Sequence, residues 1–217
     1  MIFNGQGPLW FLGIDALFEG VFFLVTLLIA WYAWRIHRFG GGKQYKTWSF
    51  GFLLISFSYL MSGVFNYLIY HELIEKANEG FLQVMELNNL YHIGIFLHEA
   101  LFLLGFLLLL LVSLKVEDRI VDATLAAFVI LLALGATYFQ AFSPLAIIIL
   151  LAGIIVGTYR HRRSFTLVIA GFAMILLAHI TYLFLMIASL AYAAGHILEF
   201  IGFGLLATSM IIILRKK

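Results

Sequence analysis

The stretch LYHIGIFLHEALFLLGFLLLLLVS, residues 90–113, decides the fold class. After Glu99 no charged or histidine side chain follows until Lys115. About 20 predominantly apolar residues are enough for a helix to cross the hydrocarbon core of a bilayer. We therefore predict a membrane span here, with His92, His98 and Glu99 in the half where it begins. Ionisable groups inside a span are costly and commonly mark a functional site.

Composition extends this prediction to the whole chain. The 217 residues are 64% hydrophobic and 11% charged, with a mean hydropathy of +1.08, whereas soluble domains carry roughly 25% charged residues. The length suits about seven spans with short loops, so we treat residues 1–217 as one transmembrane domain. The N-terminus lacks the basic region of a cleavable signal peptide. The absence of cysteine excludes disulfides and thiolate ligands, and no motif indicates nucleic acid as a partner.

The hydropathy pattern predicts an all-α integral membrane protein with seven transmembrane helices. The polar segment from His71 to Glu86 is expected to be a loop. The expected spans are Leu9–Trp34, Trp48–Tyr70, Leu87–Leu114, Ile120–Tyr138, Leu145–Tyr159, Phe165–Met186 and Tyr192–Leu214.

The distribution of basic residues sets the expected orientation. All of the 13 Lys and Arg residues except Lys76 follow spans one, three, five and seven. Cytoplasmic loops carry the excess of Lys and Arg, so this alternation predicts the N-terminus outside and the C-terminus inside. The expected location is the cell membrane, as a multi-pass protein surrounded by the lipid bilayer.

A weak internal repeat accompanies this pattern. Asn66-Tyr67-Leu68 in span two is similar to Thr181-Tyr182-Leu183 in span six, and Gly105-Phe106 in span three is similar to Gly202-Phe203 in span seven. Spans one and five both end in a basic loop. The pattern suggests a 3+1+3 plan with parallel repeats, which some transporters use.

Four expected spans carry acids or histidines in the outer half of the membrane, while the inner half carries no acid. A helix rises about 1.5 Å per residue, and this rise places the polar groups of different spans at similar depths. Residues three, four or seven apart share a helix face, whereas adjacent residues point about 100° apart. The candidate residues of this slab are Asp15, Glu19, Asn66, His92, His98, Glu99, His179, His196 and Glu199.

No span interior contains a lysine or arginine to neutralise these carboxylates. Several acids buried together cannot all stay ionised, so they are protonated, share protons with histidines, or bind a cation. Mixed imidazole and carboxylate ligands suit Zn, Fe, Mn or Cu. The expected metal ligands are Glu19, His98, Glu99, His179, His196 and Glu199, with Asp15, Asn66 and His92 beside them or leading into the site.

Other interpretations of the cluster stay open. The residues can serve as interhelical hydrogen-bonding groups or handle protons. Haem would need two facing histidines, for example His98 with His179 or His196, and no paired-histidine repeat is visible.

Three seven-span families do not fit. Retinal requires a lysine inside span seven, and Lys216 and Lys217 lie past its end. The diagnostic Pro-Gln pair of SWEET transporters is absent. The ceramidase and adiponectin-receptor hydrolases carry His-x-x-x-His in span seven, where this chain has His196-Ile-Leu-Glu199.

The sequence thus predicts a membrane protein that binds a transition metal for sensing, transfer or metal-dependent chemistry. A sensor would need a separate signalling protein, and the ligand would be a lipid or small ion. The alternatives are a metal-dependent lipid hydrolase and a proton-coupled transporter, so enzymatic activity stays open. The inner half lacks polar steps, which argues against a continuous conduction path.

Overall fold

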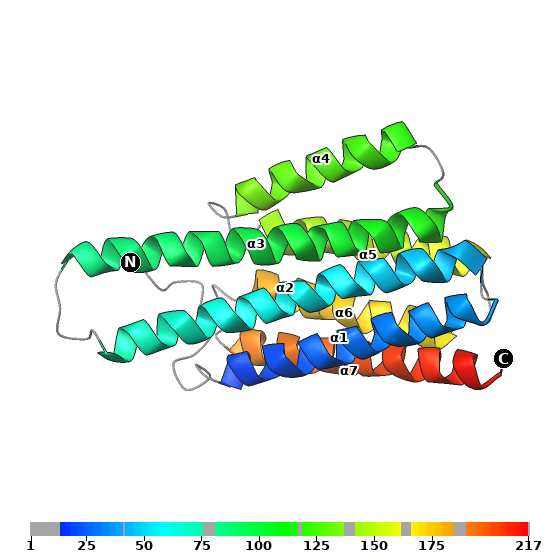
Figure 1. Cartoon of the computed structure of the whole chain (residues 1–217), viewed down its shortest axis with the longest axis horizontal. Helices are drawn as coiled ribbons and strands as arrows, with labels where there is room; N and C mark the ends of the chain where they lie inside the picture. Colours follow the sequence, from blue (N-terminus) through cyan, green and yellow to red (C-terminus); the bar gives the residue numbers. More distant parts are fainter. Residues whose placement is uncertain are drawn as a thin grey trace.

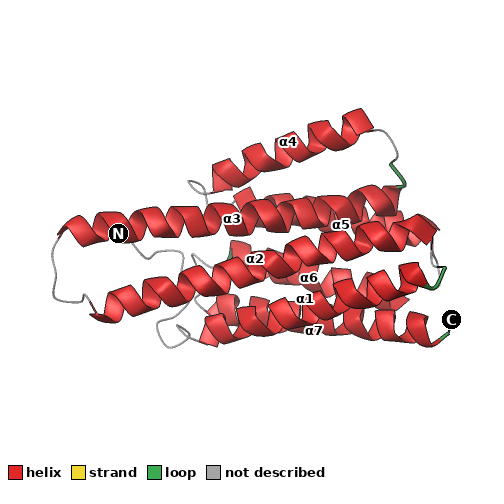
Figure 2. Cartoon of the chain, viewed as in Figure 1, coloured by secondary structure: helices red, strands yellow, loops and turns green. Residues whose placement is uncertain are grey.

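The computed structural model describes residues 14–40, 42–75, 81–116, 119–136, 142–161, 166–184 and 190–216, and the regular structure in these ranges is entirely helical (Figures 1 and 2). The all-α prediction is confirmed for these ranges. Four residues that bound expected spans lie outside these ranges: Leu9, Tyr138, Phe165 and Met186. The helices are α1 (Ile14–Arg38), α2 (Gly42–Glu75), α3 (Phe81–Leu114), α4 (Arg119–Ala136), α5 (Phe142–His161), α6 (Thr166–Leu183) and α7 (Leu190–Arg215).

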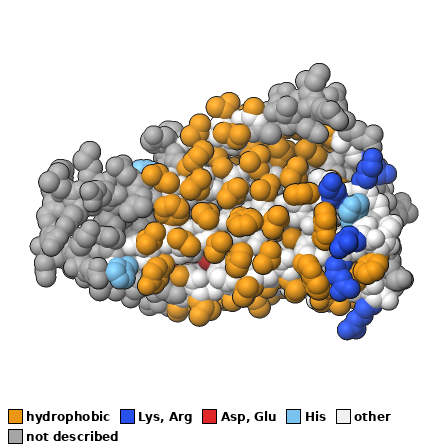
Figure 3. Space-filling view, viewed as in Figure 1, with side chains coloured by type: hydrophobic (Ala, Val, Ile, Leu, Met, Phe, Trp, Pro, Cys, Tyr) orange, Lys and Arg blue, Asp and Glu red, His pale blue; other side chains and the backbone are white. Residues whose placement is uncertain are grey.

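Among the described residues, six helices, α1, α2, α3, α5, α6 and α7, are long and apolar enough to cross a membrane. The chain is therefore a multi-pass membrane protein in its architecture. Lysine and arginine side chains form a band at one end of the bundle (Figure 3), where α1 ends at Arg38, α5 at His161 and α7 at Arg215. We call this the basic end and the opposite one the far end. A seventh span and the orientation across the membrane stay predictions.

Helices α2 and α3 are longer than the hydropathy pattern suggests. The expected loop from His71 to Glu86 is wrong over most of its length, because α2 continues to Glu75 and α3 begins at Phe81. Each helix has 34 residues, or about 50 Å at 1.5 Å per residue, against a hydrocarbon core of roughly 30 Å. The α2–α3 hairpin extends past the other helices at the far end (Figure 1). The glutamates in this segment are good helix formers. Polar residues here therefore end the apolar span but do not end the helix.

The helices pack as a closed ring in the order α1, α2, α3, α5, α6 and α7, with α7 returning to α1. Helix α4 lies outside this ring against α3 and α5 (Figure 1). The first three and the last three helices of the chain therefore form two arcs of the same ring. Side chains from both arcs meet in its interior.

Two pairs of helices approach each other at glycines in the same way. In the α2–α3 pair, a Cβ atom on Gly105 would lie 2.8 Å from the Gly51 carbonyl oxygen and 2.6 Å from Cγ1 of Ile55. In the α6–α7 pair, a Cβ atom on Gly202 would lie 2.8 Å from the Gly171 carbonyl oxygen. Small residues let membrane helices approach this closely, so the glycines fix both the spacing and the rotation of these helices.

We predict that Gly202→Ala destabilises the protein. The new methyl group would overlap a backbone oxygen, which cannot move without separating α6 from α7, and overpacking of this kind costs about 1–3 kcal/mol. Thermal unfolding of the detergent-solubilised protein measures the effect. Gly204→Ala on the same helix is the matched control, because a Cβ atom there would meet nothing within 4 Å. Equal stability of the two variants would contradict the close approach.

Candidate functional site

The carboxylate of Glu199 lies at the centre of a hydrogen-bonded network inside the ring. Tyr59 on α2 donates its hydroxyl to Oε1 of Glu199 at 2.5 Å, and Tyr182 on α6 donates to Oε2 at 2.9 Å. Glu199 on α7 is only 4% exposed. Two helices from different arcs of the ring therefore hold one buried acid.

His196 extends this network by one step, one turn before Glu199 on α7. Its Nδ1 lies 2.8 Å from the Tyr182 hydroxyl oxygen. The same nitrogen lies 3.2 Å from the Tyr192 carbonyl oxygen, which can only accept, so Nδ1 carries the proton and faces both oxygens. Tyr182 in turn donates its single hydroxyl proton to Glu199. The order of donation is His196 to Tyr182 to Glu199. We call Tyr59, Tyr182, His196 and Glu199 the Glu199 network.

Glu19 on α1 forms a second hydrogen-bonded group beside this network. Ser62 and Asn66 of α2 donate to its Oε1 at 2.5 and 2.9 Å. Its Oε2 is buried with no hydrogen-bond partner among the described residues. Tyr59, which donates to Glu199, and Ser62, which donates to Glu19, are one turn apart on α2. The Phe22 ring contacts both Tyr59 and His196, at 5.0 and 5.9 Å between centroids.

Two further histidines stack on one aromatic ring. The Phe102 ring of α3 lies 5.3 Å from the His98 ring and 5.8 Å from the His179 ring, nearly parallel to both. His98 Nδ1 is 2.8 Å from the Ser58 hydroxyl. His179 Nδ1 donates to the Ile175 carbonyl at 3.0 Å, and its ring meets the Tyr182 ring edge-on at 5.4 Å. These imidazoles border the Glu199 network without joining its hydrogen bonds.

The remaining candidate residues lie apart from the Glu199 network. Glu99 accepts a hydrogen bond from Ser143 of α5, on a different side of α3 from His98, as the 100° between neighbouring residues requires. Asp15 is buried one turn before Glu19 on α1. His92 is half-buried on α3, nearer the far end.

The structure does not gather the six expected metal ligands into one set. Within the described residues, no group of three or more histidine, aspartate or glutamate side chains is arranged to hold a metal ion. Transition metals in proteins are usually held by at least three such ligands. Metal binding therefore stays a prediction, and what the structure brings together is a hydrogen-bonded network.

The sequence did not single out the hydroxyl groups that hold the acids. Tyr59 and Tyr182 supply both bonds to Glu199, Ser62 reaches Glu19, and Ser143 reaches Glu99. One signal was present: a tyrosine in the middle of an apolar span needs a partner for its hydroxyl, and the unpaired acids were the available acceptors.

No family model, no curated protein and no solved structure matches this chain. The functional argument therefore rests on the geometry of the site.

We predict that Tyr59→Phe destabilises the protein by about 1–2 kcal/mol, since it removes one of the two hydroxyl donors to a buried carboxylate. Unfolding of the purified protein in detergent measures the loss. Tyr67→Phe is the control on the same helix, because Tyr67 is 61% exposed. If both variants unfold alike, the Tyr59–Glu199 bond contributes nothing to stability.

Proposed function

We propose that the protein is a proton-coupled carrier and that the Glu199 network binds the coupled proton. The observation that supports this most directly is the ordered donation from His196 through Tyr182 to Glu199. Imidazole, phenol and carboxyl groups in hydrogen-bonding contact can each accept and release a proton. Chains of acids and histidines inside membrane spans are typical of proton relays in pumps and transporters.

The two glycine contacts support the parallel repeat on which a carrier of this type is built. The shared geometry pairs α2 with α6 and α3 with α7, residue by residue. In both pairs a glycine and an isoleucine on one helix contact a glycine and a leucine on the other. The pairs of counterparts are Gly51 and Gly171, Phe52 and Phe172, Ile55 and Ile175, Gly105 and Gly202, Phe106 and Phe203, and Leu109 and Leu206.

This correspondence differs in part from the repeat expected from the sequence. The match of Gly105 with Gly202 is the expected one. For α2 and α6, the glycine contacts make Ser62 the counterpart of Tyr182. The sequence similarity instead makes Tyr67 the counterpart of Tyr182. The contacts are the better guide because they fix how the helices are rotated.

The same correspondence places the site between the two arcs. Tyr59 becomes the counterpart of His179, and Phe102 becomes the counterpart of Glu199. The Tyr59–Glu199 hydrogen bond and the His179–Phe102 ring contact then join corresponding positions of the two arcs. The first contact includes an acid, and the second does not. Transporters with internal repeats bind their substrates and coupling ions at the repeat interface.

A carrier also fits the apolar packing on the basic-end side of the network. Four phenylalanines with no exposed surface, Phe52, Phe106, Phe172 and Phe203, follow the network toward the basic end. A channel would need polar steps through this layer. A carrier needs only that the two arcs move against each other, so that the site opens to one side at a time.

We predict that infrared difference spectra after a pH jump contain the carbonyl band of a buried carboxylic acid, and that Glu199→Gln removes it. The amide cannot bind the proton, although it fills the same space. Glu99→Gln is the control, because Glu99 contacts Ser143 outside the network. An unchanged band in the Glu199→Gln protein would exclude Glu199 as the proton site.

Transport in proteoliposomes with an internal pH dye tests the coupling. A panel of small organic acids, amino acids and sugars is added outside, and wild-type protein should take up protons with at least one of them. Glu199→Gln should abolish that uptake but preserve exchange of the same solute. If no solute moves protons and the purified protein instead holds a stoichiometric transition metal that Glu199→Gln removes, the metal-binding alternative replaces the carrier.

A further inference from the structure

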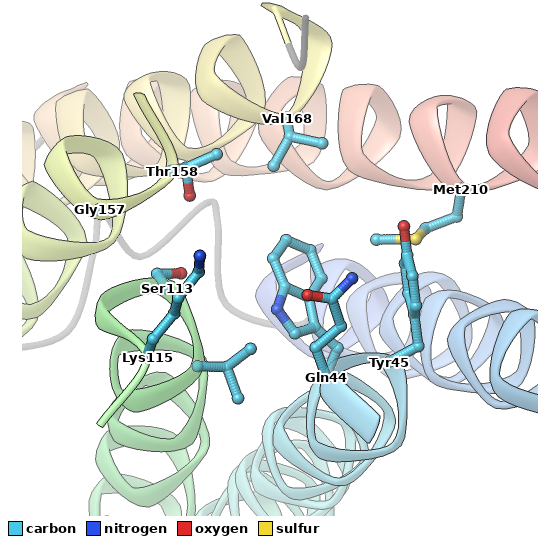
Figure 4. Close-up of a pocket in the computed structure, with 10 residues that line it drawn as sticks. Gln44, Tyr45, Ser113, Lys115, Gly157, Thr158, Val168 and Met210 are labelled. Atoms are coloured by element: carbon cyan, nitrogen blue, oxygen red, sulfur yellow. The ribbon is translucent and has the colours of Figure 1, made fainter. Parts of the chain in front are cut away.

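A cavity of about 40 Å³ lies at the basic end of the bundle. Residues of α2, α3, α5, α6 and α7 line it, so both arcs of the ring contribute (Figure 4). On α2, Trp48 in its wall precedes Phe52 and Tyr59. On α7, Met210 in its wall follows Phe203 and Glu199. The cavity and the Glu199 network therefore lie on opposite sides of the phenylalanine layer.

The polar groups of this cavity suit an anion. Lys115 and Thr158 point toward one another, and the Gln44 amide projects into the same space (Figure 4). Ser113 adds a hydroxyl, and no acid is among the lining residues. One cationic group with amide and hydroxyl groups around it is a suitable donor set for a carboxylate.

The backbone holds Lys115 in place at the end of α3. The Lys115 N–H donates to the Val112 carbonyl at 3.2 Å, and the Val116 N–H donates to the Leu111 carbonyl at 3.0 Å. Lys115 itself has a φ of 56°. This pair of bonds with a left-handed residue is a Schellman motif, which sets the direction in which the lysine leaves the helix.

The remaining wall is mostly apolar, and Tyr45 is its one further polar side chain. Trp48, Val112, Val168 and Met210 face the cavity beside the polar groups. The volume is sufficient for a few non-hydrogen atoms, because a single water needs about 10–15 Å³ by this measure. A short carboxylic acid matches both the polar and the apolar side of the cavity. Its carboxylate would lie toward Lys115 and its alkyl end toward Trp48 and Met210.

We infer that this cavity binds the carboxylate of a small organic acid, which is the carrier's substrate at its basic-end position. The substrate role rests on the proposed function, but the binding site does not. Because the network and the cavity lie on opposite sides of the phenylalanine layer, a carboxylate that reaches Glu199 from the far end takes up the proton there and becomes neutral. It releases that proton at the basic end when it binds beside Lys115, and Glu199 is reprotonated from the far end. A neutral acid crosses the phenylalanine layer without the cost of placing a charge among apolar groups.

Tryptophan fluorescence of the detergent-solubilised protein tests the site, because Trp48 is in its wall. Acetate is titrated at constant ionic strength, with acetamide as the neutral molecule of the same shape and inorganic phosphate as a second anion. We expect a saturable change with acetate and none with acetamide. Trp48→Phe should abolish the change, which assigns it to this cavity rather than to the exposed Trp31 and Trp34.

Substitutions of Lys115 decide whether the charge matters. Lys115→Gln should weaken acetate binding by about ten-fold or more, as expected for a lost charge-assisted hydrogen bond, and Lys115→Arg should restore most of it. Lys46→Gln is the control, because Lys46, like Lys115, is exposed at the basic end but does not line the cavity. Equal binding of acetamide, or equal affinity of the Lys115→Gln and Lys46→Gln proteins, overturns the inference.

Two further outcomes separate this inference from the proposed function. Saturation by phosphate but not by acetate overturns the carboxylate assignment and points to a phosphate group. Glu199→Gln should leave acetate binding unchanged, because Glu199 lies beyond the phenylalanine layer. Acetate binding without any proton movement in proteoliposomes would refute the carrier and leave the site standing, whereas proton coupling without acetate binding would refute the site alone.

Discussion

The buried carboxylate of Glu199 is the constraint on which the arrangement of the helices depends. An acid in this position has no lysine or arginine within the spans to pair with, and a charge near the bilayer centre costs about 2.5–3.5 kcal/mol even on insertion scales. The bundle meets this cost with hydroxyl donors from α2 and α6. Because Tyr59 and Tyr182 belong to different arcs, the two arcs must stay in contact wherever Glu199 is held.

The glycine contacts make that convergence geometrically available. Close approach of α3 to α2 at Gly51 and of α7 to α6 at Gly171 sets the rotation of each helix about its axis. On α7 that rotation turns Glu199 toward the interior, and on α2 it turns Tyr59 to meet it. Packing near the middle of the helices therefore determines the chemistry about one turn away. A methyl group added at such a glycine would disturb the network without touching any of its members.

Hydropathy was sufficient to predict the helices, because a run of apolar residues leaves the backbone no partner except itself in a bilayer. It placed the acids in one half of the bundle, where the structure holds Glu19 and Glu199 by hydroxyl groups one turn apart on α2. It could not predict which side chains hold them. That depends on helix rotation, which a uniformly apolar span such as residues 100–114 does not reveal. It also missed the long α2–α3 hairpin, since polar helix formers such as Glu75 end an apolar run without ending the helix.

The two arcs make the same glycine contacts but carry different side chains at corresponding positions. Phe102 of the first arc stacks on His179 of the second. Glu199, the counterpart of Phe102 in the second arc, is instead hydrogen-bonded to Tyr59 of the first. The phenylalanine layer between network and cavity, by contrast, is the same in both arcs, with Phe52 opposite Phe172 and Phe106 opposite Phe203. In the proposed carrier, the glycine contacts common to both arcs would let them move as similar units around that layer. In the proposed carrier this movement depends on a proton, because a charged Glu199 that left its tyrosine donors would expose an unpaired charge to the apolar interior.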